Sequence, residues 1–235
     1  MITLYQSKPA FGLPSISPFS IKLELFLKAA DIDYRVSTNV SRSPKGKSPF
    51  IEYRGKFIGD SSLIIDLLVK DFELTLDAHL TAHQKAIGFM ICKALEEGYY
   101  FCGLYENWKI TANWLAFRDA FLADVPKIAR IPIAGFFRRR LLQSLYLQGM
   151  GRHNVEEVQS IGIGYLSHLE AMLNGNDYLL GERFSTYDCT VYGFLARQLR
   201  VPVQSAITEY AHATSLFKNY CQRIETVYKI ATPLA

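Results

Sequence analysis

The sequence lacks closely spaced cysteines. Its four cysteines, Cys92, Cys102, Cys189 and Cys221, form no Cys-x-x-Cys or Cys-x-x-His pair. This spacing argues against a structural zinc site and against a secreted fold held together by disulfides. We therefore expect buried, unpaired thiols and no bound metal.

Long apolar runs and concentrated charge are missing too. No stretch of about 18 uncharged apolar residues occurs, and Met1 to Gln6 shows no basic segment leading into an apolar one. The net charge is only +4, and the basic residues are dispersed except at Arg138–Arg140. We expect a cytoplasmic globular protein without an integral membrane segment and without a nucleic-acid partner.

The first part of the chain mixes strand and helix patterns. Apolar residues at helical spacing predict one helix around Leu23–Ala30 and another around Ile64–Phe72. Four short runs rich in β-forming residues are predicted as strands: Ile2–Tyr5, Tyr34–Val36, Phe50–Tyr53 and Lys56–Ile58. A helix between the first two strands requires a parallel pair, whereas the short Arg54-Gly55 turn requires an antiparallel one. The predicted unit is a small mixed sheet with helices packed against it.

Beyond about residue 76 the sequence is helical. Asn154 with Glu157, and Ser185 with Asp188, have the spacing of a capping box at a helix start. Pro126 and Pro132 predict broken helices in the apolar middle region. We expect two domains: residues 1–76 form the α/β unit and residues 77–235 form an all-α unit.

The stretch "SPFS" places Ser17 directly before Pro18 at the predicted start of the first helix. Proline suits the first turn of a helix, so Ser17 is the natural N-cap. A helix amino terminus that follows a parallel strand is also an anion site, where a hydroxyl can donate to a bound thiolate. Both roles stay open from the residues alone.

Two further segments would begin at the same edge of this sheet. In "GKSPF", Ser48 precedes Pro49 at a strand start, one of the few places that favour a cis peptide bond. In "GDSSLII", Asp60 and Ser61 precede a helix, where they offer a carboxylate, a hydroxyl and free N–H groups. Together with Ser17 these segments would form a cleft for a short, thiol-bearing, zwitterionic peptide.

The pattern as a whole resembles the glutathione transferase superfamily over nearly the whole chain. The first domain resembles its thioredoxin-like domain, with "SPFS" in the place of a Cys-Pro-Tyr-Cys loop, so that dithiol exchange is excluded. The segments "SPKGKSPFIEYRGKFIGDSSLII", "GMGRHNVEEV" and "YLLGERFSTYDCTVYGFLA" look most like the failed axon connections branch, which is related to metaxins.

The resemblance implies a role for each of these residues. Ser17 would donate to the sulfur of glutathione, and Pro49 would be the cis proline of the family. Ser48 would pair with the peptide backbone, and Lys47 would contact the glycyl carboxylate. Asp60 and Ser61 would hold the γ-glutamyl group.

Tyr5 and Ser20 are rival thiol contacts, although the apolar neighbourhood of Tyr5 favours a packing role. Four aromatic residues would line an apolar pocket for the electrophile or pack in the core: Tyr99, Tyr100, Tyr105 and Trp108. The resemblance further implies a homodimer that joins glutathione to an apolar electrophile. The alternative is a non-catalytic glutathione-binding or protein-interaction scaffold with the same fold.

Overall fold

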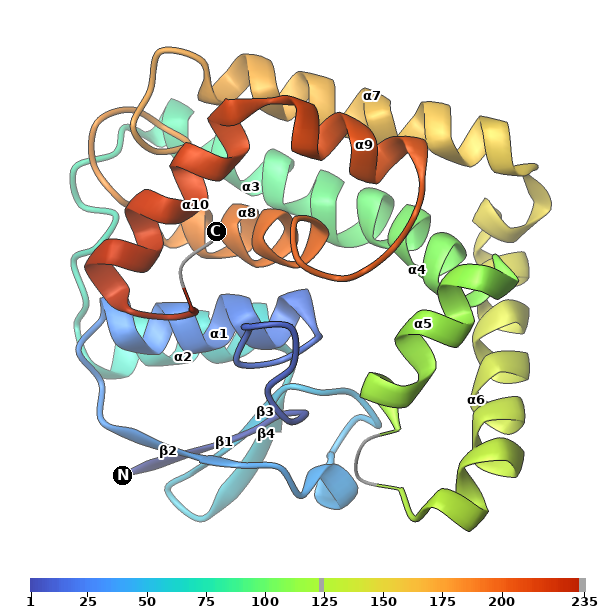
Figure 1. Cartoon of the computed structure of the whole chain (residues 1–235). Coiled ribbons are helices and arrows are strands. Elements are labelled where there is room, and N and C mark those ends of the chain that lie inside the picture. The colour runs from blue at the N-terminus through green and yellow to red at the C-terminus, as the bar shows by residue number, and fades with distance from the viewer. Residues whose placement is uncertain (123–124, 233–235) are drawn as a thin grey trace.

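The computed structural model describes residues 1–122 and 125–232, and its sheet has the four expected strands (Figure 1). Their order is β2-β1-β3-β4, with β1 and β2 parallel and the other two pairs antiparallel. The strands are β1 Ile2–Tyr5, β2 Tyr34–Ser37, β3 Phe50–Tyr53 and β4 Lys56–Gly59. The predicted mixed sheet is therefore confirmed.

The turn between β3 and β4 shows why the hairpin forms where it does. Arg54 and Gly55 both have positive φ angles, 51° and 74°. Two left-handed residues give the two-residue turn whose twist matches that of the flanking strands. The hairpin fixes the register, in which Phe50 is the partner of Gly59.

The register brings three chain segments to one edge of the sheet. Tyr5, at the end of β1, is paired with Phe50, and Phe50 is paired with Gly59 at the end of β4. The loop after β1, the segment before β3 and the start of the helix after β4 therefore leave the sheet at the same side. This arrangement depends only on strand order and direction.

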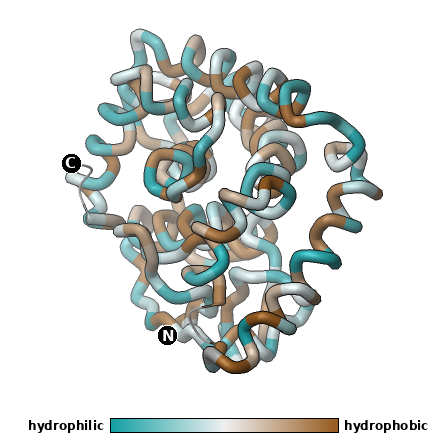
Figure 2. Tube along the Cα trace, turned by 45° about the vertical axis from the view of Figure 1, so that its right-hand side comes forward, coloured by the Kyte–Doolittle hydropathy of each residue, from teal (hydrophilic) through white to brown (hydrophobic). Residues whose placement is uncertain are grey.

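The helix between β1 and β2 and the helix after β4 lie on the same side of the sheet (Figure 1). Polar and apolar positions alternate along the helices, as expected of helices that bury one side (Figure 2). Among the described residues, no helix is both long enough and apolar enough to cross a membrane. The helices are α1 Pro18–Ala29, α2 Ser61–Asp71, α3 Ala82–Ala94, α4 Tyr100–Trp108, α5 Thr111–Phe121, α6 Lys127–Gln148, α7 Val155–Leu173, α8 Thr186–Gln198, α9 Ala206–Ala213 and α10 Ser215–Tyr228, with short η1 Val40–Arg42, π-helical η2 Leu95–Tyr99 and η3 Met150–Arg152. The predicted helical second part is confirmed, while the boundary at residue 76 stays a prediction.

The middle region differs from the sequence prediction. Pro126 stands directly before α6 and Pro132 lies inside it, yet α6 continues to Gln148. The expectation of a break at Pro132 is wrong. A proline removes a single hydrogen bond, here to the carbonyl of Ile128, and Ile128 is 93% exposed. Water can therefore satisfy the freed carbonyl at this position.

Helix α8 is fixed at its start by a buried carboxylate. Asp188 accepts hydrogen bonds from the Leu179 backbone at 2.7 Å, the Ser185 backbone at 2.8 Å and the Tyr220 hydroxyl at 2.8 Å. The capping boxes predicted at Ser185 and at Asn154 are both present. A fixed start determines where the rest of α8 meets α1.

Helix α8 lies very close to the backbone of α1 at Gly193. A Cβ atom at this position would lie 2.5 Å from the Pro18 carbonyl oxygen and 3.2 Å from the Lys22 backbone nitrogen. Both neighbours are backbone atoms of the first turns of α1, which have little freedom to move. Glycine is thus required for the two helices to pack at this distance.

We expect Gly193→Ala to lower the free energy of unfolding by about 1–3 kcal/mol, because overpacking must push α8 away from α1. Gly164→Ala is the matched control, since a Cβ atom there would meet nothing within 4 Å and alanine favours the α7 helix. Urea unfolding followed by circular dichroism measures both variants. Equal stability of the two variants would contradict the packing argument.

Candidate functional site

Ser17 lies at the amino terminus of α1 with an unoccupied hydroxyl. Its backbone is extended, with φ −91° and ψ 124°, and its carbonyl accepts from Ser20 and Ile21 at 3.1 Å. Its backbone N–H donates to the Ser15 hydroxyl at 3.2 Å. The side chain makes no capping bond, and within residues 1–122 and 125–232 it has no hydrogen-bond partner. Ser17 therefore occupies the N-cap position while its hydroxyl stays free for another partner.

The two rival hydroxyl groups are placed differently. Ser20 is completely buried, and its hydroxyl has no partner in the described structure. The hydroxyl of Tyr5 donates to the Glu52 carboxylate at 2.9 Å, and this bond, with burial as a smaller cause, raises the pKa of Tyr5. The ring of Tyr5 stacks on Phe50 with centroids 4.6 Å apart. Tyr5 thus packs on the sheet, with its proton held by a carboxylate.

The segment before β3 carries the expected backbone geometry. The Ser48–Pro49 peptide bond is cis, and Pro49 is buried at the start of the strand. The hydroxyl of Ser48 is buried without a partner among the described residues. The backbone of Lys47 is held by the Ser43 hydroxyl, which accepts from its N–H at 2.8 Å and donates to its carbonyl at 2.6 Å, while the lysine side chain is exposed.

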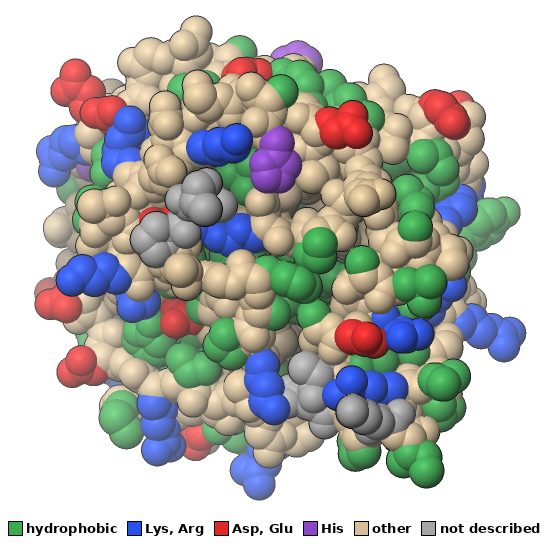
Figure 3. Space-filling model, in the orientation of Figure 1, with side chains coloured by type: hydrophobic (Ala, Val, Ile, Leu, Met, Phe, Trp, Pro, Cys, Tyr) green, Lys and Arg blue, Asp and Glu red, His purple; other side chains and the backbone are tan. Residues whose placement is uncertain are grey.

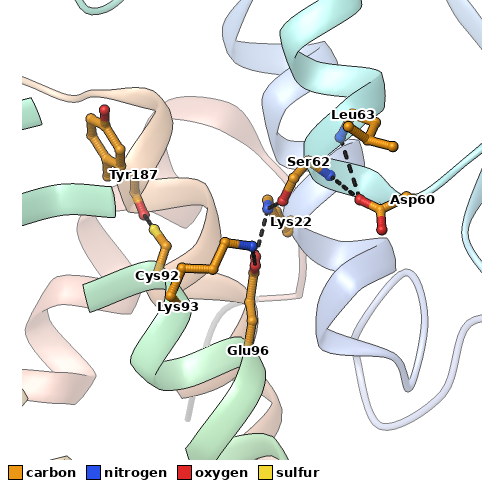
Figure 4. Close-up of polar contacts among 8 residues, drawn as sticks. All are labelled: Lys22, Asp60, Ser62, Leu63, Cys92, Lys93, Glu96 and Tyr187. Carbon is orange, nitrogen blue, oxygen red and sulfur yellow. Dashed lines mark hydrogen bonds and ion pairs between the residues drawn. The ribbon is translucent and has the colours of Figure 1, made fainter. Parts of the chain in front are cut away.

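Asp60 and Ser61 form the start of α2. One carboxylate oxygen of Asp60 accepts from the backbone of Ser62 at 3.2 Å and of Leu63 at 3.3 Å, so Asp60 caps the helix (Figure 4). Its φ of 87° is unusual for a residue with a side chain. Ser61 is buried directly behind it. Strained backbone of this kind is concentrated at binding sites.

A buried ion pair joins this helix start to the helical part of the chain. The ammonium group of Lys22, on α1, lies 2.9 Å from the Ser62 hydroxyl and 2.6 Å from the Glu96 carboxylate, and Lys93 contacts the other oxygen of Glu96 at 3.0 Å (Figure 4). Glu96 belongs to the π-helical turn η2, a type of turn frequent at functional sites. Removing Glu96 would leave the buried Lys22 ammonium group without its carboxylate, so the contact holds α1, α2 and η2 in one arrangement.

A pocket of about 240 Å³ opens beside Ser17. Ser17 and Pro18 form one side, and aromatic residues of the helical part form the walls. In Figure 3, hydrophobic side chains gather near the middle of the drawn face, over the region where Figure 1 places the amino end of α1 opposite α5. The pocket therefore extends from the edge of the sheet at Ser17 into an apolar space among the helices, and this space is called the chamber below.

Three of the four predicted aromatic residues line this pocket: Tyr99, Tyr100 and Trp108. Tyr105 does not, because it is buried in the core and its hydroxyl donates to the His153 carbonyl at 3.1 Å. Aromatic side chains from neighbouring turns of one helix can face either the pocket or the core. The sequence alone does not show which of the two a given side chain faces.

Three polar residues of the pocket were not identified from the sequence: Arg197, Asn107 and Gln198. Arg197, on α8, donates from Nε to the Ile16 carbonyl at 3.0 Å. Burial is the main cause that lowers its pKa from the ordinary value. Asn107, on α4, is buried, and its side-chain oxygen has no partner in the described structure. An arginine among the apolar residues of α8 gives no local signal of a pocket, because only its contact with Ile16 in the folded protein reveals one.

A buried carboxylate stands close to Arg197. Burial raises the pKa of Glu106 to about 7, while a hydrogen bond from Ser205 and the charge of Arg197 act in the opposite direction. The cysteines offer no nucleophile here, because all four are buried. Burial raises the pKa of Cys92 to about 11 and that of Cys102 to about 12.

A thioredoxin-like sheet followed by helices, with a hydroxyl at the first helix and an apolar chamber beside it, defines the class of glutathione transferase-like proteins. The family models agree: "Glutathione S-transferase N-terminal domain" matches residues 18–114 and "Glutathione S-transferase, C-terminal domain" matches residues 162–224. The chain belongs to the glutathione S-transferase family. Ser17 lies one residue before the first match, so its role rests on the geometry.

The similar proteins include an enzyme and also members of the predicted failed axon connections and metaxin branch. The isoprene-epoxide–glutathione S-transferase of Rhodococcus sp. (strain AD45) is 30% identical over 239 residues, covering 98% of this chain and all of that protein. Failed axon connections of Drosophila melanogaster is 30% identical over 89% of this chain, which spans only 54% of that protein. A metaxin-1 homolog of Caenorhabditis briggsae is 26% identical over 96% of this chain and 72% of that protein.

Solved structures share the fold. The β-etherase LigF from Sphingobium sp. strain SYK-6 has a TM-score of 0.66 at 16% identity, covering 95% of this chain and 94% of the other. Glutathione transferase F7 from Populus trichocarpa has a TM-score of 0.60 at 12% identity, covering 96% and 94%. At these identities the likeness establishes the architecture alone.

The pKa of Glu106 predicts a measurable pH dependence of stability. Between its ordinary pKa of 4.5 and about 7, the folded protein keeps a proton that the unfolded chain has released. This carboxyl group therefore lowers the free energy of unfolding as pH rises through that range, by about 3 kcal/mol at about 1.4 kcal/mol per pH unit. Glu106→Gln has no titrating group at this position. The difference in unfolding free energy between this variant and the wild type should therefore increase, in favour of the variant, by that amount from pH 4.5 to pH 7. Parallel curves of unfolding free energy from pH 4.5 to 7 would contradict this assignment.

Proposed function

We propose that this protein binds glutathione and transfers it to a small electrophile. The observation that supports this proposal most strongly is the free hydroxyl of Ser17 at the amino terminus of α1, open to an apolar pocket. Glutathione is proposed as the co-substrate because of the family and because the chain is similar over its full length to a glutathione S-transferase. We also propose that the protein is a homodimer, as the family resemblance implies, and that it acts in the cytoplasm.

The groups at the sheet edge match the parts of glutathione. Asp60 caps α2 with one oxygen, which leaves the other for the ammonium group of the γ-glutamyl residue, while Ser61 lies beside the free N–H groups of α2 for its carboxylate. Ser48, before the cis bond, is proposed to pair with the cysteinyl backbone, and Pro49 to orient it. The exposed Lys47 is proposed to contact the glycyl carboxylate.

This placement leaves the sulfur of glutathione at Ser17. A free thiol has a pKa of about 8.5, and a helix amino terminus lowers that value by favouring the thiolate. A hydroxyl that donates to the sulfur adds to this effect. The thiolate would then attack an electrophile held in the apolar pocket. Because the Rhodococcus relative is named for an epoxide of isoprene, a small epoxide is the first substrate to test.

Ser17→Ala should lower kcat/KM for a small epoxide by about 10- to 150-fold, because a hydrogen bond to a charged group contributes about 1.5–3 kcal/mol. Ser20→Ala is the control: it removes a hydroxyl three residues away that is buried and outside the pocket. Steady-state kinetics with glutathione and the epoxide compare the three proteins. If Ser17→Ala is as active as the wild type, Ser17 has no part in the reaction.

Asp60→Asn should weaken glutathione binding by about 10- to 100-fold, since it removes the charge for the ammonium group. Asparagine caps helices as well as aspartate does, so α2 stays intact. Isothermal titration calorimetry measures the affinity, and the melting temperature checks the fold. Unchanged affinity would exclude Asp60 from the glutathione site.

The alternative is a binding or scaffold protein, and the similarity to Failed axon connections and to the metaxin-1 homolog is the observation that favours it. The calorimetric and kinetic measurements described above distinguish the two functions. Glutathione affinity without turnover of any electrophile indicates a binding protein, and no affinity indicates a scaffold.

A further inference from the structure

Arg197 places one charge inside an otherwise uncharged chamber. Among the described residues that line the pocket, it alone carries a charged side chain. Its guanidinium carbon lies 5.8 Å from the ring centre of Phe117, so its surroundings are aromatic. Arg197 is half-buried, and a cation withdrawn from water into apolar surroundings is unfavourable unless an anion or a strong acceptor meets it.

The protein satisfies Arg197 only in part. Its Nε donates to the Ile16 carbonyl, but no carboxylate in residues 1–122 and 125–232 lies within ion-pair distance of it. Glu106 is near enough for its charge to act on Arg197 but is itself partly protonated near neutral pH, because its pKa is about 7. Gly103 faces the guanidinium, and even an added Cβ atom would stay 3.8 Å from Nη1. The guanidinium therefore has room for a ligand atom beside it.

Asn107 adds an acceptor without a donor in the same pocket. Its side-chain oxygen is buried and unpaired, whereas the neighbouring Gln198 accepts from the Tyr99 hydroxyl and donates to the Thr208 hydroxyl, both at 2.8 Å. A ligand hydroxyl matches the chemistry of both groups, because it accepts a hydrogen bond from a guanidinium and donates one to an amide oxygen.

We infer that Arg197 and Asn107 select electrophiles whose oxygen atom becomes negatively charged when the thiolate attacks, epoxides in particular. This inference rests on the proposed transfer of glutathione. The sulfur forms a bond to a ring carbon, the carbon–oxygen bond breaks, and its electron pair stays on the oxygen. Arg197 stabilises the resulting alkoxide, which takes a proton from water and becomes the hydroxyl that donates to Asn107.

A pair of substrates of equal chain length isolates this effect. 1,2-Epoxyhexane leaves its charged oxygen in the pocket, whereas 1-bromohexane releases bromide and leaves an uncharged thioether. Arg197→Met should lower kcat/KM for the epoxide by at least about 30-fold, and for the bromide by no more than about 3-fold. Asn107→Leu should lower the epoxide value alone, by about 3- to 10-fold. The exposed Arg139, replaced by methionine, is the control for loss of a positive charge.

The bromide also reports on the structural role of Arg197. Losing the bond to the Ile16 carbonyl would disturb the neighbouring Ser17, and that disturbance would slow both substrates equally. An equal loss on both substrates, or no loss on either, overturns the inference while the proposed transfer stands. If the wild type turns over neither substrate, the proposed function fails and this inference with it.

Discussion

The site depends on one close packing contact, the approach of Gly193 to the first turn of α1. Because α8 lies against the backbone of Pro18, the side chains around Gly193 reach the amino end of α1 from the helical part of the chain. Phe194 packs edge-on against Phe19, and Arg197, one turn further, reaches the Ile16 carbonyl. A bulkier residue at position 193 would separate the candidate thiol-binding hydroxyl from its chamber.

The second attachment between the two parts is electrostatic. Lys22 and Glu96 are both buried, and the Glu96 carboxylate compensates the charge of Lys22 and also that of Lys93. Lys22 also donates to Ser62, in the first turn of α2 that Asp60 caps. The Asp60 side of the candidate site is therefore fixed to the helices by an ion pair, and the Ser17 side by apolar packing. Both sides are held before any ligand binds, which lowers the entropic cost of binding.

The parts predictable from the sequence are those set by local rules. The strands, the Arg54-Gly55 turn and the Asn154 capping box follow from β-propensity, left-handed conformations and side-chain caps. Tyr105, Arg197 and Asn107 could not be assigned, because whether a helical side chain faces the core or the pocket depends on which helix packs against it. Pro132 was wrongly predicted to break a helix, since solvent exposure decides whether a lost hydrogen bond matters.

The free hydroxyl of Ser17 also explains the absence of thiols at this loop. A cysteine at a helix amino terminus would itself ionise and react, because the helix dipole stabilises its thiolate. A serine hydroxyl does not ionise there, so under the proposed function it donates a hydrogen bond and a bound thiol supplies the nucleophile. The chain's own cysteines are buried with raised pKa values and cannot compete for the electrophile. Under the proposed function, the ligand therefore supplies the reactive group and the pocket determines specificity.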